Sequence, residues 1–140
     1  MREPVSSPFT SFLAQHFDQI NDYLATFFDG QATSADIERY LYTPLSAFTA
    51  NAGKRHRPLI CMLACHAVGG SMERARSAAA AIEHFHTAAL IHDDIADEAT
   101  LRRGEPCLHL TQGLGLAINA GDLGLMLVNG TVMHDPALDD

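Results

Sequence analysis

The sequence predicts an all-α fold, an antiparallel helical bundle, and three observations support this prediction. Apolar residues recur mostly every three or four positions along several stretches, Gly and Pro separate these stretches, and none alternates apolar with polar residues as a half-buried strand would. With 140 residues, 47% of them hydrophobic and 19% charged, the chain has about the size and composition of one globular domain.

The first two helices are predicted over residues 8–28 and 34–51. Ser7 is a suitable N-cap and a proline at the first helical position needs no backbone donor, so the first helix begins at about residue 8. Asp29-Gly30 ends it. The second begins near Ser34, and Pro44 is expected to break or kink it.

Two further helices are predicted over residues 58–68 and 71–98. Pro58 opens the first of these and Gly69-Gly70 ends it. Ser71 is the expected N-cap of the next helix, whose alanine run would allow neighbouring helices to pack closely.

The last helix is predicted over residues 116–133. Residues 101–115 contain several glycines and a proline, so they are expected to form an irregular connection.

The charge of the chain excludes one class of function. A net charge of −8 is unfavourable for a nucleic-acid binder, which needs clustered basic residues against phosphate. The scarce positive charge is nevertheless concentrated in two short motifs, since the chain has only nine Lys and Arg. Those motifs contain Lys54, Arg55, Arg57, Arg102 and Arg103.

Location is predicted from apolar runs and cysteines. The longest apolar runs are shorter than the roughly 20 residues that span a bilayer, so no transmembrane segment is expected. The first residues lack the apolar core of a secretory signal, and three cysteines are an odd number without a Cys-x-x-Cys pair. These features predict a cytoplasmic protein.

One stripe of the helix 71–98 carries candidate metal ligands. Steps of seven and eleven residues return to nearly the same helical heading, so His86, Asp93 and Asp97 share one face. Carboxylates one turn apart repel each other unless a cation lies between them, and paired oxygen ligands suit Mg²⁺. An acidic helix end or a local ion-pair network remains an alternative.

Basic residues near this stripe indicate a diphosphate ligand. Arg102 and Arg103 follow the helix and offer guanidinium groups to phosphate oxygens. Lys54 and Arg57 lie just ahead of a helix start, where backbone N–H groups already favour an anion. A solvated basic turn is the alternative for this second motif.

The ordered set of motifs resembles the N-terminal half of the trans-polyprenyl diphosphate synthases. The motifs are Gly-Lys-Arg-x-Arg-Pro at 53–58, His-x6-Asp-Asp-x-x-Asp at 86–97, Leu-Arg-Arg-Gly-x-Pro at 101–106, His109 and Ala-Gly-Asp at 120–122. The resemblance extends over nearly the whole chain. It implies a helical bundle of the isoprenoid synthase type around a central cavity, of which residues 1–140 would form only the N-terminal half.

The same resemblance implies an activity and a role for each residue. The activity is head-to-tail condensation of isopentenyl diphosphate with an allylic diphosphate, which makes a longer polyprenyl diphosphate with Mg²⁺. Asp93 and Asp97 would ligate Mg²⁺, with Asp94 supporting them, and Arg102 would contact the allylic diphosphate. The residues implied to bind the diphosphate of isopentenyl diphosphate are Lys54, Arg57, His86 and Arg103.

The resemblance also implies a chain-length gate and a missing part. Ala88 and Ala89 occupy the gating positions one turn before Asp93, and their small size predicts products longer than the shortest in the family. The family's second aspartate-rich motif has no counterpart after Asp97, where the terminal aspartates are Asp135, Asp139 and Asp140. The expectation is therefore a homodimer or a second chain that supplies the C-terminal half.

Two other functions are left open. A regulatory subunit could dock on a complete synthase without catalysing a reaction. A His-Asp metal-dependent phosphohydrolase could use His92-Asp93 as its central pair, with His66 and Asp122 as further ligands. The hydrolase reading gives no role to the two basic motifs.

Overall fold

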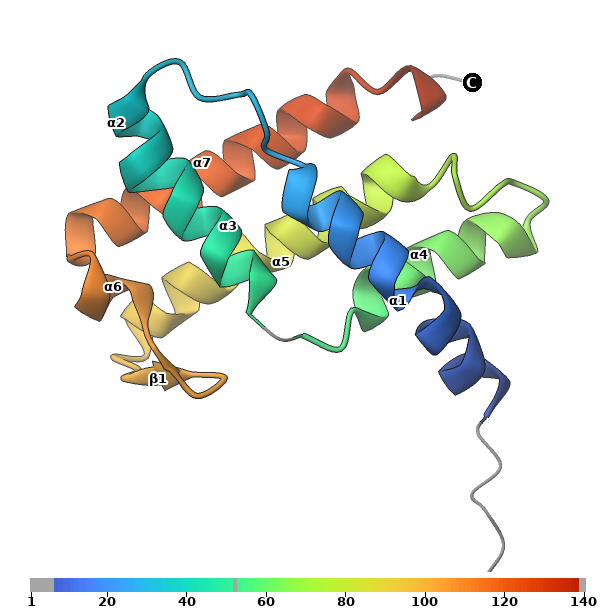
Figure 1. Cartoon of the computed structure of the whole chain (residues 1–140), viewed down its shortest axis with the longest axis horizontal. Coiled ribbons are helices and arrows are strands. Elements are labelled where there is room, and N and C mark those ends of the chain that lie inside the picture. The colour runs from blue at the N-terminus through green and yellow to red at the C-terminus, as the bar shows by residue number, and fades with distance from the viewer. Residues whose placement is uncertain (1–6, 52, 139–140) are drawn as a thin grey trace, which may run out of the picture.

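The all-α prediction is confirmed by a computed structural model, which describes residues 7–51 and 53–138 (Figure 1). Helices make up nearly all of the regular structure in this part of the chain. Asp139 and Asp140 lie outside the described residues.

Helix α1 (Pro8–Thr26) begins as predicted. The Ser7 hydroxyl accepts a hydrogen bond from the Thr10 N–H at 3.1 Å, and Pro8 takes the first helical position. The helix ends at Thr26 rather than at residue 28, and Gly30 follows with a φ of +73° that favours glycine.

The predicted second helix is continuous but irregular. It consists of α2 (Ala35–Ile37), the π-helical segment η1 (Glu38–Tyr42) and α3 (Thr43–Ala50). The N–H of Thr43 reaches back five residues to the Glu38 carbonyl, and Pro44 then lies in the first turn of α3. Because proline has no N–H to donate, the wide turn ahead of it lets the helix continue instead of breaking.

Helix α4 (His56–Ala67) begins two residues before the predicted start at Pro58. Its N-cap, Arg55, has left-handed backbone angles, φ 50° and ψ 28°, which turn the chain directly into the helix. The predicted end is confirmed, because Gly69 takes a φ of +92° and the Gly70 N–H binds the Cys65 carbonyl at 2.9 Å.

Helix α5 (Arg76–Ala96) is shorter than the predicted helix 71–98. The Ser71 hydroxyl accepts from the Arg74 N–H at 3.2 Å, so it caps a separate turn and not α5 itself. The alanine run packs as expected, since Ala79, Ala80 and Ala81 are each only 2% exposed.

The predicted irregular connection over residues 101–115 contains some regular structure. Strands β1 (Leu101–Arg102) and β2 (Glu105–Pro106) form an antiparallel hairpin, followed by the short helix α6 (Leu108–Thr111). Strands of two residues are too short to show an alternating pattern. The turn residues, Arg103 at φ 55° and Gly104 at φ 87°, fit a two-residue hairpin loop with positive φ at both positions.

Helix α7 (Leu114–Met133) begins two residues before the prediction and ends as predicted, and the 3₁₀ turn η2 (Pro136–Leu138) follows. In the described part of the chain, α7 is one helix that length and composition alone would allow to cross a membrane, with a mean hydropathy of 1.3. The mean hydropathy over the helix identifies this segment. A search for uninterrupted apolar runs does not identify it, because Asp122 lies within it. Core helices, which are mostly buried, meet the same criterion, whereas 28% of this window of α7 is buried, mainly where α7 packs along α5.

Helix α5 lies at the centre of the fold (Figure 1). It packs against α7, α4, α1 and α3, so its alanine face is covered by several neighbours. Two apolar clusters fill the core, one joining α1, α4 and α5 and the other joining η1, α3, α5 and α7. Ile91 and Ile95 belong to or pack against the second cluster, so the last turns of α5 are held in the core.

Candidate functional site

Asp93 and Asp97 lie at the C-terminal end of α5, and both are exposed. The Asp97 N–H donates to the Asp93 carbonyl at 2.8 Å, which places the two residues one turn apart. Among the described residues neither carboxylate is in an ion pair or a side-chain hydrogen bond, and no group of three or more possible metal ligands occurs. A pair of free carboxylates fits Mg²⁺, which keeps several waters and uses one or two protein carboxylates.

Asp94 has a different environment from its two neighbours in the motif. It is 1% exposed, and its Oδ1 accepts from Arg102 Nε at 2.6 Å and also contacts Arg102 Nη2. This contact raises the pKa of Arg102, and burial raises the pKa of the nearby Cys107 thiol, with Asp94 contributing. The structure therefore places Asp94 where it holds Arg102, while the predicted support of a metal by Asp94 stays a prediction.

Arg103 points to a different partner from Arg102. Its Nη1 donates to the Asn51 carbonyl at 2.7 Å, which ties the hairpin to the end of α3. Its backbone is left-handed at φ 55°, a conformation that costs a non-glycine residue about 1–2 kcal/mol. Such strain persists only where surrounding contacts hold it, and it is common at functional sites.

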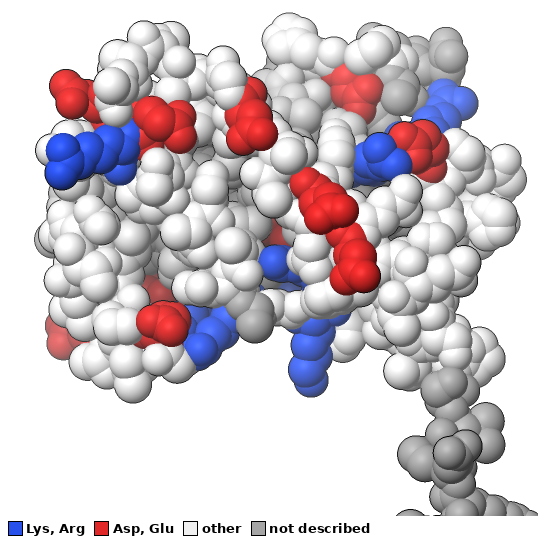
Figure 2. Space-filling model, in the orientation of Figure 1, with Lys and Arg blue, Asp and Glu red and all other residues white. Residues whose placement is uncertain are grey.

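A basic cleft of about 350 Å³ lies between this hairpin and the start of α4. It is lined by residues 53–57 together with Glu83 and Arg103. On the face drawn in Figure 2, basic side chains lie along the edge occupied by the hairpin and the loop before α4. Lys54 and Arg57 are both exposed there, so their charges are available to a ligand.

His86 of α5 lies near the basic residues of this cleft but is not among the residues that line it. Burial lowers its pKa, and the next cause is the positive charge of Arg57, with Arg103 and Arg102 adding to it. The Glu83 carboxylate acts in the opposite direction. The structure thus brings His86 near the basic residues of both sequence motifs.

Arg55 is the residue of this region that sequence analysis did not assign. It is 5% exposed and donates from Nε to Asn21 Oδ1 at 2.8 Å, from Nη1 to Glu83 Oε1 at 2.9 Å and from Nη2 to the Thr49 carbonyl at 2.7 Å. One signal was present in the sequence, because Glu83 falls on the alanine-rich buried face of α5. A carboxylate in such a position needs a buried cation.

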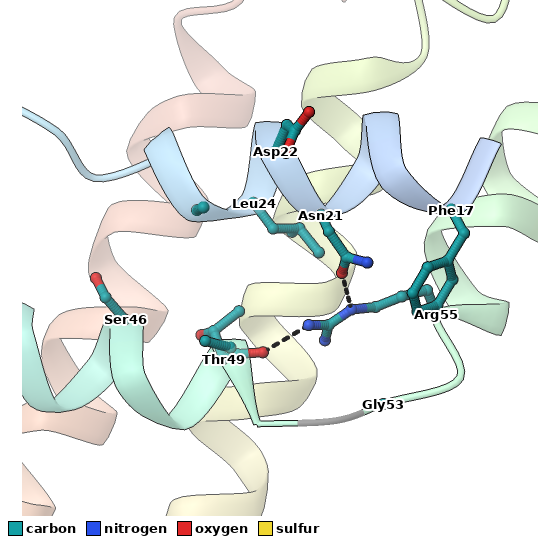
Figure 3. Close-up of a pocket in the computed structure, with 10 residues that line it drawn as sticks. Phe17, Asn21, Asp22, Leu24, Ser46, Thr49, Gly53 and Arg55 are labelled. Carbon is teal, nitrogen blue, oxygen red and sulfur yellow. Dashed lines mark hydrogen bonds between the residues drawn. The ribbon is translucent and has the colours of Figure 1, made fainter.

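A second cavity, of about 440 Å³, lies between α1 and α3 (Figure 3). Its walls are mainly apolar, and Arg55 and Gly53 line both this cavity and the basic cleft. In Figure 3 the Arg55 side chain extends toward Asn21 and Thr49. The buried arginine therefore separates the apolar cavity from the cleft.

The two predicted gate residues differ in environment. Ala88 is fully buried, and a Cβ added at Gly124 of α7 would lie 3.1 Å from the Ala88 Cβ. Ala89 is half-buried. Ala88 thus serves the contact between α5 and α7, and the gating role of both residues stays a prediction.

In the described part of the chain, His92 belongs to no group of three or more possible metal ligands. Its Nε2 lies 3.2 Å from Asp122 Oδ1, which joins α5 to α7, and His66 completes no ligand group with this pair. Gly121 leaves room for the ring, because a Cβ there would lie 2.5 Å from Nε2.

Comparison with known proteins gives matches over most of the chain. The family model described as polyprenyl synthetase matches residues 38–135. A geranylgeranyl diphosphate synthase of Sulfolobus acidocaldarius is 40% identical over 117 residues, which is 84% of this chain and 34% of that protein. The chloroplastic geranylgeranyl pyrophosphate synthase 11 of Arabidopsis thaliana is 52% identical over 77 residues, or 54% of this chain and 22% of that one.

Solved structures show the same fold. A geranylgeranyl pyrophosphate synthetase from Pyrococcus horikoshii superposes with a TM-score of 0.78 at 31% identity, covering 91% of this chain and 38% of that chain. One from Geoglobus acetivorans has a TM-score of 0.79 at 26% identity, with coverages of 93% and 40%. The chain spans about a third of the length of the Sulfolobus relative.

Proposed function

This chain belongs to the polyprenyl synthetase family, and we propose that it carries the diphosphate- and magnesium-binding part of a site for prenyl chain elongation. The reaction is condensation of isopentenyl diphosphate with an allylic diphosphate. The observation that supports this proposal most directly is the cleft, which brings Lys54 and Arg57 together with Arg103. His86 lies close enough for Arg57, Arg103 and Arg102 to act on it electrostatically. Two segments distant in sequence, residues 54–57 and Arg103, supply its positive charge.

Isopentenyl diphosphate is the proposed ligand of the basic cleft. Lys54, Arg57 and Arg103 line a space of about 350 Å³, and His86 lies within the electrostatic reach of Arg57 and Arg103. A diphosphate offers several acceptor oxygens to such donors. The N-terminal end of α4 adds backbone N–H groups and a favourable helix dipole.

The allylic diphosphate is proposed to bind near Asp93, Asp97 and Arg102. Ionisation of this substrate breaks its carbon–oxygen bond and leaves negative charge on the diphosphate, which nearby cations stabilise. Mg²⁺ bound through Asp93 and Asp97 would supply part of that positive charge. Asp94 fixes the Arg102 guanidinium, which keeps Nη1 available for the departing diphosphate.

The product is proposed to be longer than the shortest in the family. Ala89 is half-buried on α5 one turn before Asp93, where a small side chain leaves room for a growing prenyl chain. Ala88 contributes indirectly, because its small size lets α7 approach closely.

Turnover with labelled isopentenyl diphosphate, farnesyl diphosphate and Mg²⁺ tests the proposed function. The 140-residue chain is assayed alone and mixed with the C-terminal part of a homologous synthase. We expect a Mg²⁺-dependent polyprenyl product in the mixture, its loss in Asp93→Ala, and its retention in Asp36→Ala, an exposed aspartate on α2.

Product from the chain alone would show a homodimer that completes its own site. Mg²⁺-dependent binding of both substrates without product in any mixture would instead favour the regulatory subunit. Absence of substrate binding would contradict the proposal. A homodimer or a second chain as partner, and a cytoplasmic location, stay predictions.

A further inference from the structure

We infer that Arg55, held by Glu83, is a positioning residue of the diphosphate cleft. In this role Arg55 does not bind the ligand. It fixes the turn that presents Lys54 and Arg57, and it does so through a buried hydrogen-bonded ion pair with α5. The inference rests on the proposed function.

The contacts of Arg55 explain how one side chain can fix this turn. Its donors reach three separate elements: Asn21 on α1, Glu83 on α5 and the Thr49 carbonyl on α3. Both charged side chains of the pair are only 4% exposed. A guanidinium group suits this role because its donors lie in a rigid plane, whereas an ammonium group is a point charge.

The backbone of Arg55 is left-handed immediately before α4. Its carbonyl accepts from the Leu59 N–H at 3.3 Å, so the same residue begins the first turn of the helix. Non-glycine residues hold this conformation only where surrounding contacts require it, and the three side-chain contacts supply that requirement. Lys54 precedes the turn and Arg57 follows it within α4.

Gly53 connects this turn to the hairpin. A Cβ built on Gly53 would lie 3.3 Å from Arg55 Nη1 and 3.2 Å from Arg103 Nη1. Two guanidinium groups therefore converge over a residue that has no side chain. Arg103 is itself held by the Asn51 carbonyl, so both sides of the cleft are fixed.

The charge of the pair argues against direct binding by Arg55. Glu83 offsets the positive charge of Arg55, and the Arg55 side chain is almost completely buried among its partners. The exposed charges of Lys54 and Arg57 remain for the ligand. The contribution of Arg55 is therefore geometric.

Calorimetric titration of the 140-residue chain with isopentenyl diphosphate and with inorganic pyrophosphate tests this inference. We expect Arg55→Lys to weaken both ligands about tenfold, because small displacements of binding groups are costly. Lys54→Ala is expected to weaken binding strongly in the wild type and much less in the Arg55→Lys background. This non-additivity identifies action through Lys54.

Two controls separate positioning from a loss of stability. Val128→Ala removes buried volume from α7, away from the cleft, and is expected to lower the melting temperature without changing either affinity. Glu83→Gln keeps an oxygen acceptor and removes the charge. If Arg55→Lys does not fold, Glu83→Gln tests the positioning role in its place. In both Arg55→Lys and Glu83→Gln, faster amide hydrogen exchange over residues 53–57 is expected without ligand.

Affinities within twofold of wild type in both Arg55→Lys and Glu83→Gln would overturn the positioning role while leaving the proposed function intact. So would additive effects of Arg55→Lys and Lys54→Ala. If the wild-type chain binds neither ligand, the proposed function fails and the inference fails with it.

Discussion

Neighbouring residues of one motif can have opposite environments, as Asp93 and Asp94 show. The first is exposed and the second is buried against Arg102. Helical phase in the sequence separates Asp94 from the stripe of Asp93 and Asp97, but it does not show that Asp94 is buried against a residue of the hairpin. The helical phase of α5 and the fold of the hairpin decide which carboxylate is available.

Asp94→Asn is expected to lower the free energy of unfolding by about 2 kcal/mol, because it leaves Arg102 without its buried charged partner. Asp93→Asn is the matched control and is expected to change that free energy by less than about 0.5 kcal/mol. Urea denaturation of both variants measures the difference. Equal losses would contradict the assigned environments.

For magnesium binding, in contrast to stability, the substitution of Asp93 is expected to have the larger effect. Asp93→Asn removes a proposed ligand, so Mg²⁺-dependent binding of pyrophosphate is expected to weaken at least tenfold, measured by calorimetry with and without Mg²⁺. Asp36→Asn, on the exposed surface of α2, serves as its control. Unchanged binding in Asp93→Asn would exclude this carboxylate as a metal ligand.

His84 predicts an acid-dependent loss of stability. It is fully buried against Phe27 and Phe28, and burial followed by the charge of Arg55 lowers its pKa from 6.5 to about 3. Between those values the unfolded chain holds a proton that the folded chain does not. The free energy of unfolding therefore falls as the pH falls from 6.5 toward 3, by at most about 1.4 kcal/mol per pH unit.

Urea denaturation between pH 4.5 and 6.5 checks this prediction. His84→Gln has no imidazole to protonate, so its stability is expected to fall less steeply on acidification than that of the wild type. His66→Gln, at an exposed position, is the matched control and is expected to keep the wild-type slope. Identical slopes for all three proteins would rule out His84 as the cause.

At the scale of the element, two glycines of α7 have different surroundings. Gly121 faces the His92 ring, whereas a Cβ at Gly130 would have no atom within 4 Å. The two positions lie on the same helix, so they provide a matched pair for separating helix propensity from steric conflict.

Gly130→Ala is expected to stabilise the protein by about 0.5–1 kcal/mol, since alanine is the better helix former. Gly121→Ala is expected to destabilise it by about 1 kcal/mol, because the ring must move away from Asp122. Thermal denaturation of the two variants measures the contrast. A similar gain at both positions would show that the ring moves without cost.

The sequence predicts an element well when the signal is local. Ser7 and Ser34 lie within one turn of the N–H groups that they accept, so both helix starts were predictable. The pair of Arg55 and Glu83 spans 28 residues of sequence, and only tertiary packing brings it together. Local periodicity therefore located the helices and the acidic stripe, and it missed the contact that fixes the cleft.

At the scale of the whole molecule, apolar side chains remain exposed on the two central helices. Phe85 on α5 is 52% exposed, and Met126 and Met133 on α7 are 72% and 74% exposed. Such groups favour association with another apolar surface. The expected homodimer or second chain stays a prediction, and this face of α7 is a place to test it.

Met126→Lys combined with Met133→Lys is expected to reduce self-association, measured by sedimentation velocity over a range of protein concentrations. Each lysine places a charge where an interface would exclude water. Asn129→Lys adds the same charge at an exposed polar position of α7 and is the control. Association unchanged by the double substitution would exclude this face of α7 as the interface.

The hairpin has a consequence for mutational tolerance. Arg102 ends β1 and Arg103 opens the turn, so consecutive arginines reach Asp94 on α5 and the carbonyl that follows α3. Neither can compensate for the loss of the other. In a library of single substitutions we expect a loss of stability or binding at each of the two positions. In a disordered basic loop, by contrast, one arginine could replace the other and either substitution would be tolerated.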